Sequence, residues 1–237
     1  MRIAMWSGPR NLSTAMMYSF AARGDCAVVD EPFYAAYLAL TGLGHPMRDQ
    51  ILASQSQDPV VVAREICGSN PDEKPHFYQK HMTQHMVPGV PRAWMADVKN
   101  VFLIRHPARV IASYAAKREN PVLDDIGFRQ QAELFGQVRD MGGEPAGIDS
   151  HDIRADPEAA LRRLCAAIGL ESTANMLTWP KGGHPDDGVW AQHWYGAVWQ
   201  SVGFAEPEGA LPEVPENLQP VLQAALPYYE AMKRETI

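Results

Sequence analysis

The sequence is poor in cysteine and has no long apolar run. Its 237 residues include three cysteines, which stand alone and far apart: Cys26, Cys67 and Cys165. Single cysteines in odd number form neither a disulfide framework nor a zinc site. No apolar run approaches the roughly 20 residues of a membrane-spanning helix, and the first predicted strand leaves no room for a signal peptide before it. We therefore expect a cytoplasmic protein without membrane contact.

Positive charge is also in short supply. Lys and Arg number 21 against 28 Asp and Glu, which gives a net charge of −7. Non-specific nucleic-acid binding needs a basic face, so this class of function is disfavoured. The hydrophobic content of 46% and the charged content of 21% are ordinary for a globular protein. No internal repeat is visible, and the length suits one α/β domain over residues 1–237.

The loop of the nucleotide kinases is missing too. That loop reads G-x-x-x-x-G-K-[ST], whereas here Gly8 is followed five residues on by Ser13-Thr14, without a Gly-Lys pair. The stretch still predicts a strand over residues 3–6, a tight loop, and a helix over residues 12–20. Backbone N–H groups and the positive end of the helix would converge there on an anion, and Arg10 adds a forked cation. The alternative is a strand–helix turn that binds nothing.

A second candidate anion site follows a later strand. Residues 101–104, Val-Phe-Leu-Ile, form the continuous apolar run of a strand buried on both faces. Arg105 stands at its carboxyl end, Pro107 fits the first turn of a helix, and Ser113 lies nearly two turns into that helix. Ligands of open α/β sheets bind outside the carboxyl ends of strands, so Arg105 is expected in the same crevice as the first loop. Taken singly, each residue is better explained as an ordinary surface side chain.

Together the two stretches resemble the sulfotransferases that use 3′-phosphoadenosine 5′-phosphosulfate. Residues 9–14, Pro-Arg-Asn-Leu-Ser-Thr, resemble their 5′-phosphosulfate loop, P-[KR]-S-G-T-T, and the run from Arg105 to Ser113 resembles their 3′-phosphate motif, R-x-P followed by five residues and Ser. The resemblance implies a P-loop-like, three-layer α/β fold with a central, mainly parallel sheet, and that cofactor with no required metal. Leu12 replaces the usual glycine, so a left-handed backbone is less accessible there. The implied cofactor-binding residues are Gly8, Pro9, Arg10, Asn11, Leu12, Ser13, Thr14, Arg105 and Ser113.

A pair of carboxylates follows the second predicted strand, residues 26–29. Asp30 and Glu31 therefore face the same crevice. In the carbohydrate sulfotransferases a glutamate near this point is thought to be the base, and Glu31-Pro32 resembles that element. The resemblance implies that Glu31 accepts the proton of the acceptor. Capping of the helix predicted over residues 33–40 is the other explanation, and we expect one of the two carboxylates to serve as that cap.

A lysine and a histidine follow the third predicted strand, at residues 77–78. The cytosolic sulfotransferases carry K-T-H-L at the corresponding point, where the histidine is the base and the lysine contacts the transferred group. Residues 80–82, Lys-His-Met, resemble that motif with one residue missing, so Lys80 and His81 are not both expected to reach the crevice. His81 and His85 lie four residues apart without an H-E-x-x-H context. We expect them on a solvated helix face rather than at a metal site.

The C-terminal third contains an aromatic-rich stretch, residues 179–199. The cytosolic family covers its cofactor with a loop R-K-G-x-x-G-D-W, and Lys181-Gly182 with Trp190 is similar in type at looser spacing. The resemblance adds Lys181 and Gly182 to the cofactor-binding residues, although packing of a terminal helix explains the tryptophans equally well. We expect residues 179–237 to form an aromatic and helical segment, and residues 33–74 to form a helical insertion on the acceptor side.

The sequence thus predicts transfer of a sulfuryl group to a hydroxyl or amine of a small-molecule acceptor, which leaves adenosine 3′,5′-bisphosphate. Arg10 and the loop amides would stabilise the departing phosphate oxygen, Lys80 would contact the transferred group, and Glu31 or His81 would be the base. An ATP-dependent, kinase-like phosphotransferase and a non-catalytic nucleotide-binding protein on the same fold are the alternatives. The acceptor and the oligomeric state, a homodimer included, stay open.

Overall fold

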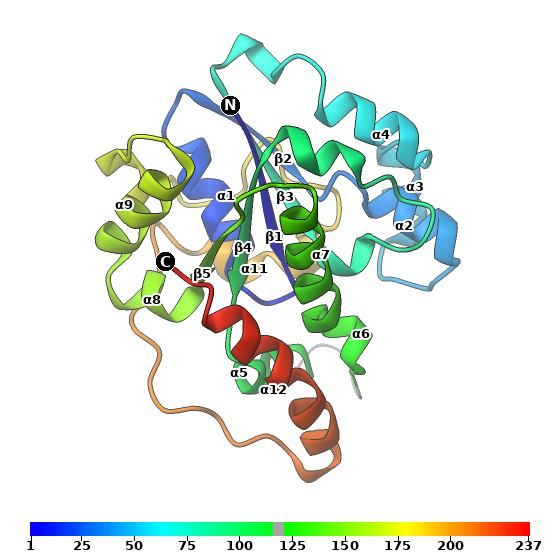
Figure 1. The fold of residues 1–237 in the computed structure, drawn as a ribbon, viewed down its shortest axis with the longest axis vertical. Coiled ribbons are helices and arrows are strands. Elements are labelled where there is room, and N and C mark those ends of the chain that lie inside the picture. The colour runs from blue at the N-terminus through cyan, green and yellow to red at the C-terminus, as the bar shows by residue number, and fades with distance from the viewer. Residues whose placement is uncertain (116–120) are drawn as a thin grey trace.

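The computed structural model describes residues 1–115 and 121–237. Its centre is a five-stranded sheet in the order β2-β3-β1-β4-β5, and every paired strand runs parallel to its neighbour (Figure 1). The strands are β1 (Arg2–Ser7), β2 (Cys26–Asp30), β3 (His76–Met82), β4 (Lys99–Ile104) and β5 (Ala146–Asp149). Each apolar run predicted to be a strand is one.

Helices cover both faces of the sheet because its strands are apolar on both sides. Successive side chains of a strand point to opposite faces, so Ile3 and Met5 pack on one side of β1 while Ala4 and Trp6 pack on the other. The first side is covered by α1 (Ser13–Ala21) and α9 (Pro157–Ile168), and the second by α4 (Pro59–Ile66), α7 (Phe128–Asp140) and α12 (Gln219–Lys233) (Figure 1). The predicted three-layer α/β fold with a central parallel sheet is confirmed.

The register of the sheet brings the functional loops together. Ser7, the last residue of β1, lies level with Met82 of β3 and with Leu103 of β4, and Asp30 of β2 lies level with Lys80. The loops that follow β1, β2, β3 and β4 therefore leave the same edge of the sheet. The segments that carry the predicted site residues meet there by topology.

The segments outside the sheet are mostly short helices. Residues 33–74 contain α2 (Tyr34–Thr41), α3 (Arg48–Ser54), α4 and a 3-10 turn at Pro71–Glu73. The remaining helices are α5 (Pro107–Ala115), α6 (Leu123–Ile126), α8 (Ser150–Ala155), α10 (Ala191–Trp194) and α11 (Gly196–Trp199). Further 3-10 turns span Thr83–His85, Ala93–Asp97, Ala174–Leu177 and Glu216–Leu218.

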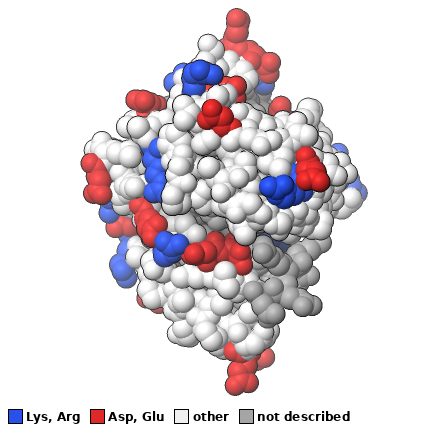
Figure 2. Space-filling view, turned by 90° about the vertical axis from the view of Figure 1, so that its right-hand side faces the viewer, with Lys and Arg blue, Asp and Glu red and all other residues white. Residues whose placement is uncertain are grey.

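The surface view and the helix lengths bear on the expected partners. Figure 2 shows a face on which lysine and arginine side chains stand singly among acidic ones and broad neutral areas. Within the described ranges, no helix combines the length and the apolar character needed to cross a membrane. A cytoplasmic location stays a prediction.

A glycine breaks the helical segment of residues 123–140. Gly127 has φ 73° and separates α6 from α7. The break brings the Ile126 carbonyl oxygen against Gly8, where a Cβ atom on Gly8 would lie 2.4 Å from that oxygen. The glycine at the head of the β1 loop is therefore required for close packing against α6.

We predict that Gly8→Ala destabilises the protein by about 1–3 kcal/mol, because the added methyl group overpacks a backbone contact. Gly136→Ala is the matched control: Gly136 lies inside α7, and a Cβ atom added there would meet no described atom within 4 Å beyond its neighbours in the same helix. That control should gain about 0.5–1 kcal/mol. Thermal unfolding of the two variants beside the wild type measures both effects, and equal midpoints would contradict the packing argument.

Candidate active site

The loop after β1 has an unusual backbone. Arg10 and Leu12 both adopt the left-handed conformation, with φ 62° and 71°. The left-handed conformation costs a residue with a side chain roughly 1–2 kcal/mol. Leu12 adopts it nevertheless, although it is less accessible to leucine than to the glycine usual at this position. The Asn11 side chain anchors the loop by donating from Nδ2 to the carbonyl oxygen of Leu103, at 3.1 Å, on the end of β4. Such strain held in place by a neighbouring strand is typical of ligand-binding loops.

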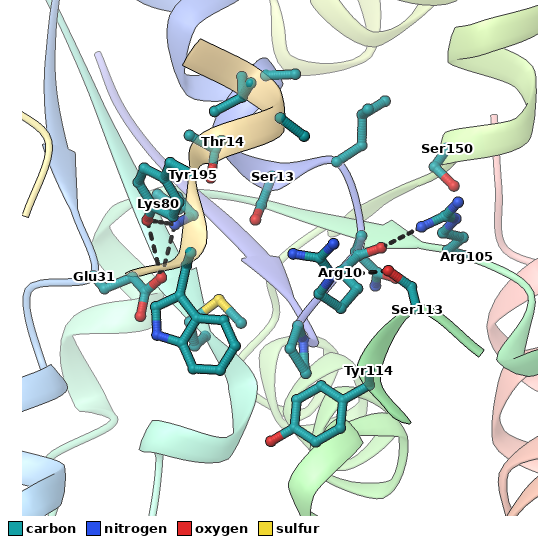
Figure 3. A pocket seen from close by; sticks show the side chains of 18 of the residues that line it. Arg10, Ser13, Thr14, Glu31, Lys80, Arg105, Ser113, Tyr114, Ser150 and Tyr195 are labelled. Carbon is teal, nitrogen blue, oxygen red and sulfur yellow. Dashed lines mark hydrogen bonds and ion pairs between the residues drawn. The ribbon is translucent and has the colours of Figure 1, made fainter. Parts of the chain in front are cut away.

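The two predicted anion-binding stretches meet at this loop. Arg10 Nε donates to Ser113 Oγ at 2.8 Å, and Arg105 donates from one guanidinium nitrogen to the Arg10 carbonyl oxygen at 2.6 Å (Figure 3). Burial, together with the positive charge of Arg105, lowers the pKa of Arg10. Two cations held this close in a half-buried position favour an anionic ligand between them.

A buried ion cluster lies at the other end of the site. The Lys80 ammonium group, 1% exposed, donates to Asp30 Oδ1 at 2.8 Å. It also donates to Glu31 Oε1 at 2.7 Å (Figure 3). Tyr195 accepts a hydrogen bond from Lys80 and donates to Asp30 Oδ2 at 2.8 Å. The expectation that Asp30 or Glu31 caps a helix is wrong, since α2 has Phe33 at its N-cap position without a side-chain cap. Both carboxylates neutralise Lys80 instead.

The protonation states follow from this cluster. Burial opposes charge on Lys80, but the two adjacent carboxylates outweigh it and raise the pKa of Lys80, which stays a cation. Burial, reinforced by the charge of Asp30, raises the pKa of Glu31 despite the attraction of Lys80. A carboxylate with a raised pKa binds a proton more readily than an ordinary one. Glu31 is thus suited to act as a general base.

His81 does not reach the site, and its assignment as a candidate base is corrected. Neighbouring residues of a strand point to opposite faces, so Lys80 enters the site and His81 enters the core. The imidazole of His81 stacks on Trp6 with ring centroids 4.5 Å apart, and Nε2 lies 3.2 Å from Gln79 Oε1. Burial lowers the pKa of His81 to about 3. The residue missing between lysine and histidine has the predicted effect of separating them.

His85 is a site residue that the sequence patterns did not predict. It is buried in the 3-10 turn after β3, not on a solvated helix face, and its ring stacks against both Tyr34 and Tyr37, at centroid distances of 4.6 and 4.7 Å. Its Nε2 lies 3.9 Å from Glu31 Oε2. Burial lowers the pKa of His85 well below the ordinary value, so it is neutral. The spacing of His85 four residues after His81 does not indicate that His81 lies in the core and His85 lies beside Glu31.

One cavity of about 590 Å³ connects the cationic loop with the ion cluster. Its lining includes both groups, namely Pro9, Arg10, Asn11, Leu12, Ser13, Thr14, Arg105 and Ser113 at one end and Glu31, Lys80, His85 and Tyr195 at the other. Within residues 1–115 and 121–237, no cluster of three histidine, cysteine, aspartate or glutamate side chains could hold a metal ion. The arrangement places cationic hydrogen-bond donors and a carboxylate with a raised pKa around one volume of ligand size.

A family model described as a sulfotransferase domain matches residues 1–236. The chain belongs to the sulfotransferase family. Among solved structures, a sulfotransferase from Alicyclobacillus acidocaldarius superposes with a TM-score of 0.55 at 12% identity, covering 99% of this chain and 96% of that chain. The sulfotransferase domain of the Synechococcus PCC 7002 olefin synthase gives 0.51 at 16% identity, covering 94% of each. At such identities these likenesses concern the fold.

A curated plant relative is similar over the same range. Branched-chain-amino-acid aminotransferase-like protein 1 of Arabidopsis thaliana is 36% identical over 231 residues, which cover 98% of this chain and 41% of the relative. The chain therefore spans about two fifths of the length of the curated relatives that it matches.

Three predicted cofactor residues do not line the cavity. Gly8 packs against α6, while Lys181 and Gly182 lie in a turn in which Gly182 N donates to the Trp199 carbonyl oxygen at 2.9 Å. The aromatic segment contributes to the site through Trp190 and Tyr195 instead. Trp190 is buried and donates from Nε1 to the Tyr195 hydroxyl at 3.0 Å, which positions Tyr195 against Lys80. Lys181 and Gly182, which resemble the family's loop only at looser spacing, therefore lie outside the cavity lining, and no sequence motif indicated Tyr195.

We predict that Lys80→Met destabilises the protein by about 3–5 kcal/mol near neutral pH, because it leaves Asp30 and Glu31 buried without their cation. The loss should shrink as the pH falls, since the folded state of this variant takes up protons on these carboxylates more readily than the unfolded chain does. Lys99→Met, at the exposed start of β4, is the control and should change little. Denaturant unfolding at pH 5 and pH 8 tests this, and a pH-independent loss would contradict it.

Proposed function

We propose that this sulfotransferase moves a sulfuryl group from 3′-phosphoadenosine 5′-phosphosulfate to a hydroxyl or amine of a small-molecule acceptor. The observation that carries the proposal is the single cavity that has the Arg10 loop at one end and the Glu31–Lys80 cluster at the other. Such a cavity brings a donor anion and an acceptor proton to the same space. Positioning of this kind supplies much of the rate of group-transfer reactions.

The residues present fit the cofactor. Arg10, Ser13 and Thr14 line the strained loop that would hold the 5′ end, and Arg105 with Ser113 would hold the 3′-phosphate. Ser150, the first residue of α8, has a buried Oγ without a hydrogen-bond partner among the described residues, and it lines the same end of the cavity. Phosphate oxygens would satisfy that hydroxyl and the arginine donors together. When bound, the cofactor supplies the sulfuryl group on its 5′-phosphate.

Glu31 would remove the proton of the acceptor. Glu31 would take the proton of the acceptor hydroxyl or amine, so that the oxygen or nitrogen could accept the sulfuryl group that the bound cofactor would supply, with the 5′-phosphate as the leaving group. Arg10 and the loop N–H groups would stabilise the negative charge left on that phosphate. Lys80 keeps Glu31 in place and supplies a fixed positive charge beside the acceptor. None of these steps uses His81.

The acceptor end combines aromatic rings with hydrogen-bonding groups. Tyr34, His45 and Trp194 line it beside Glu31 and His85. Flat, apolar walls with a few polar groups favour a small, partly apolar acceptor. The kinase-like alternative is weaker, because the loop has no lysine for a nucleotide's terminal phosphates and ATP has no 3′-phosphate for Arg105 and Ser113.

We predict that the protein binds adenosine 3′,5′-bisphosphate more tightly than AMP or ATP. Arg105→Ala should weaken binding of the bisphosphate by about ten- to a hundredfold, the equivalent of losing one charge-assisted contact, and should leave AMP unaffected. Arg162→Ala, on the exposed face of α9, is the control for loss of positive charge. Calorimetric titration measures all three ligands. Equal affinities for bisphosphate and AMP would remove the cofactor from the proposal.

We also predict that Glu31→Gln lowers kcat by about 10²–10⁴-fold, as expected for loss of a general base, while bisphosphate binding stays intact. His81→Phe should retain most of the activity, because His81 faces the core. The raised pKa of Glu31 places the acidic fall of kcat above the ordinary pKa of a glutamate, since the base must be unprotonated. Sulfate transfer to a panel of phenols, alcohols and amines provides the assay. Activity lost in His81→Phe but kept in Glu31→Gln would reverse the assignment.

A further inference from the structure

The segment between α11 and α12 closes the cationic end of the cavity. This long stretch without regular structure is orange in Figure 1, and its Gly203 and Ala205 line the cavity wall. It carries Glu208, whose side chain is 2% exposed although the segment lies at the surface. A carboxylate buried on a surface segment needs compensating charge.

Three arginines from three different elements hold that carboxylate. Arg105, after β4, donates from Nε to Glu208 Oε1 at 3.1 Å and also from a terminal nitrogen. Arg154 of α8 donates to the same oxygen at 2.9 Å, and Arg109 Nε of α5 lies 3.1 Å from Oε2. Although Glu208 is desolvated by burial, these three cations hold the pKa of its carboxyl below the ordinary value. It is therefore an anion in an arginine site.

Glu208 occupies the donors that a 3′-phosphate would need. Arg105 directs Nε and one terminal nitrogen to Glu208, and its other terminal nitrogen to the Arg10 carbonyl oxygen. A carboxylate thus occupies the side of the guanidinium group that would bind a phosphate. Both anions accept the same pair of parallel N–H hydrogen bonds from arginine. The phosphate and Glu208 cannot both have these hydrogen bonds.

Two residues outside the predicted motifs, Ser150 and Arg154, favour binding of a phosphate over binding of Glu208. The buried Ser150 Oγ has no hydrogen-bond partner among the described residues and faces this end of the cavity near Arg105 (Figure 3). Arg154, one helical turn further along α8, lines the cavity as well. Three arginines meet one negative charge on Glu208, whereas a phosphate monoester brings about 1.5–2. The site is under-neutralised as it stands.

We propose that Glu208 is an internal competitor for the 3′-phosphate, which displaces it from Arg105 and Arg154 and gains a hydrogen bond from Ser150. Residues 203–209 then form a strap that the nucleotide opens, so that nucleotides without a 3′-phosphate leave it closed. The inference rests on the cofactor named in the proposed function. It adds Ser150 and Arg154 as 3′-phosphate ligands and Glu208 as the residue that sets the affinity.

Titration of the full chain with adenosine 3′,5′-bisphosphate and with AMP tests this. Glu208→Gln keeps the shape and removes the competing charge, so it should bind the bisphosphate roughly tenfold more tightly and AMP unchanged. Glu206→Gln is the matched control. Glu206 is exposed on the same segment and contacts Arg154 through its backbone carbonyl oxygen, so this variant should leave both affinities unchanged. Ser150→Ala, which does not touch Glu208, should weaken the bisphosphate several-fold and spare AMP.

The outcomes separate this inference from the proposed function. If the wild type prefers the bisphosphate to AMP but Glu208→Gln binds it equally or more weakly, Glu208 orders the arginines instead of competing, and the inference is overturned while the cofactor stands. If the wild type does not prefer the bisphosphate to AMP, the cofactor assignment fails and the inference fails with it. A bisphosphate preference that is present in the wild type and rises in Glu208→Gln supports both. Thermal unfolding of each variant shows whether the chain is folded in the titration.

Discussion

The site depends on one buried cation. Lys80 lies in β3, the strand between β2 and β1. Its ammonium group contacts Asp30 and Glu31 at the end of β2 and Tyr195 from the C-terminal third. Because a charge in the core is costly unless it is paired and hydrogen-bonded, these segments are held together with it. Burial, reinforced by the charge of Asp30, raises the pKa of Glu31 within this cluster, although Lys80 opposes the rise. Stability and the proposed general-base chemistry therefore rest on the same group of residues.

Charge is divided along the cavity. Arginines gather where β1, β4 and β5 end, and carboxylates gather with Lys80 where β2 and β3 end. Under the proposed function, a nucleotide anion would bind at one end of the cavity and the acceptor would lose its proton at the other, with the transferred group between them. Glu208 is the exception, a carboxylate among the arginines, and its place identifies it as a substitute for an anionic ligand.

Much of this could be predicted from local sequence. The apolar run at residues 101–104 and the loop at residues 9–14 are contiguous, and parallel pairing brings the ends of their strands together. Tyr195, Arg154 and Glu208 could not be predicted in this way. Each reaches the site from a segment distant in sequence, through packing of side chains that carries no motif. The β-strand alternation did separate Lys80 from His81, but only the core around Trp6 shows which of the two faces inward.

A crystal structure with adenosine 3′,5′-bisphosphate bound would be the sharpest test of this division of the cavity. We predict the 3′-phosphate against Arg105, Ser113 and Ser150, the 5′-phosphate in the loop at residues 10–14, and Glu31 facing the open space beyond it. A bisphosphate bound outside the cavity, or one whose 3′-phosphate lies away from Arg105, would contradict these assignments.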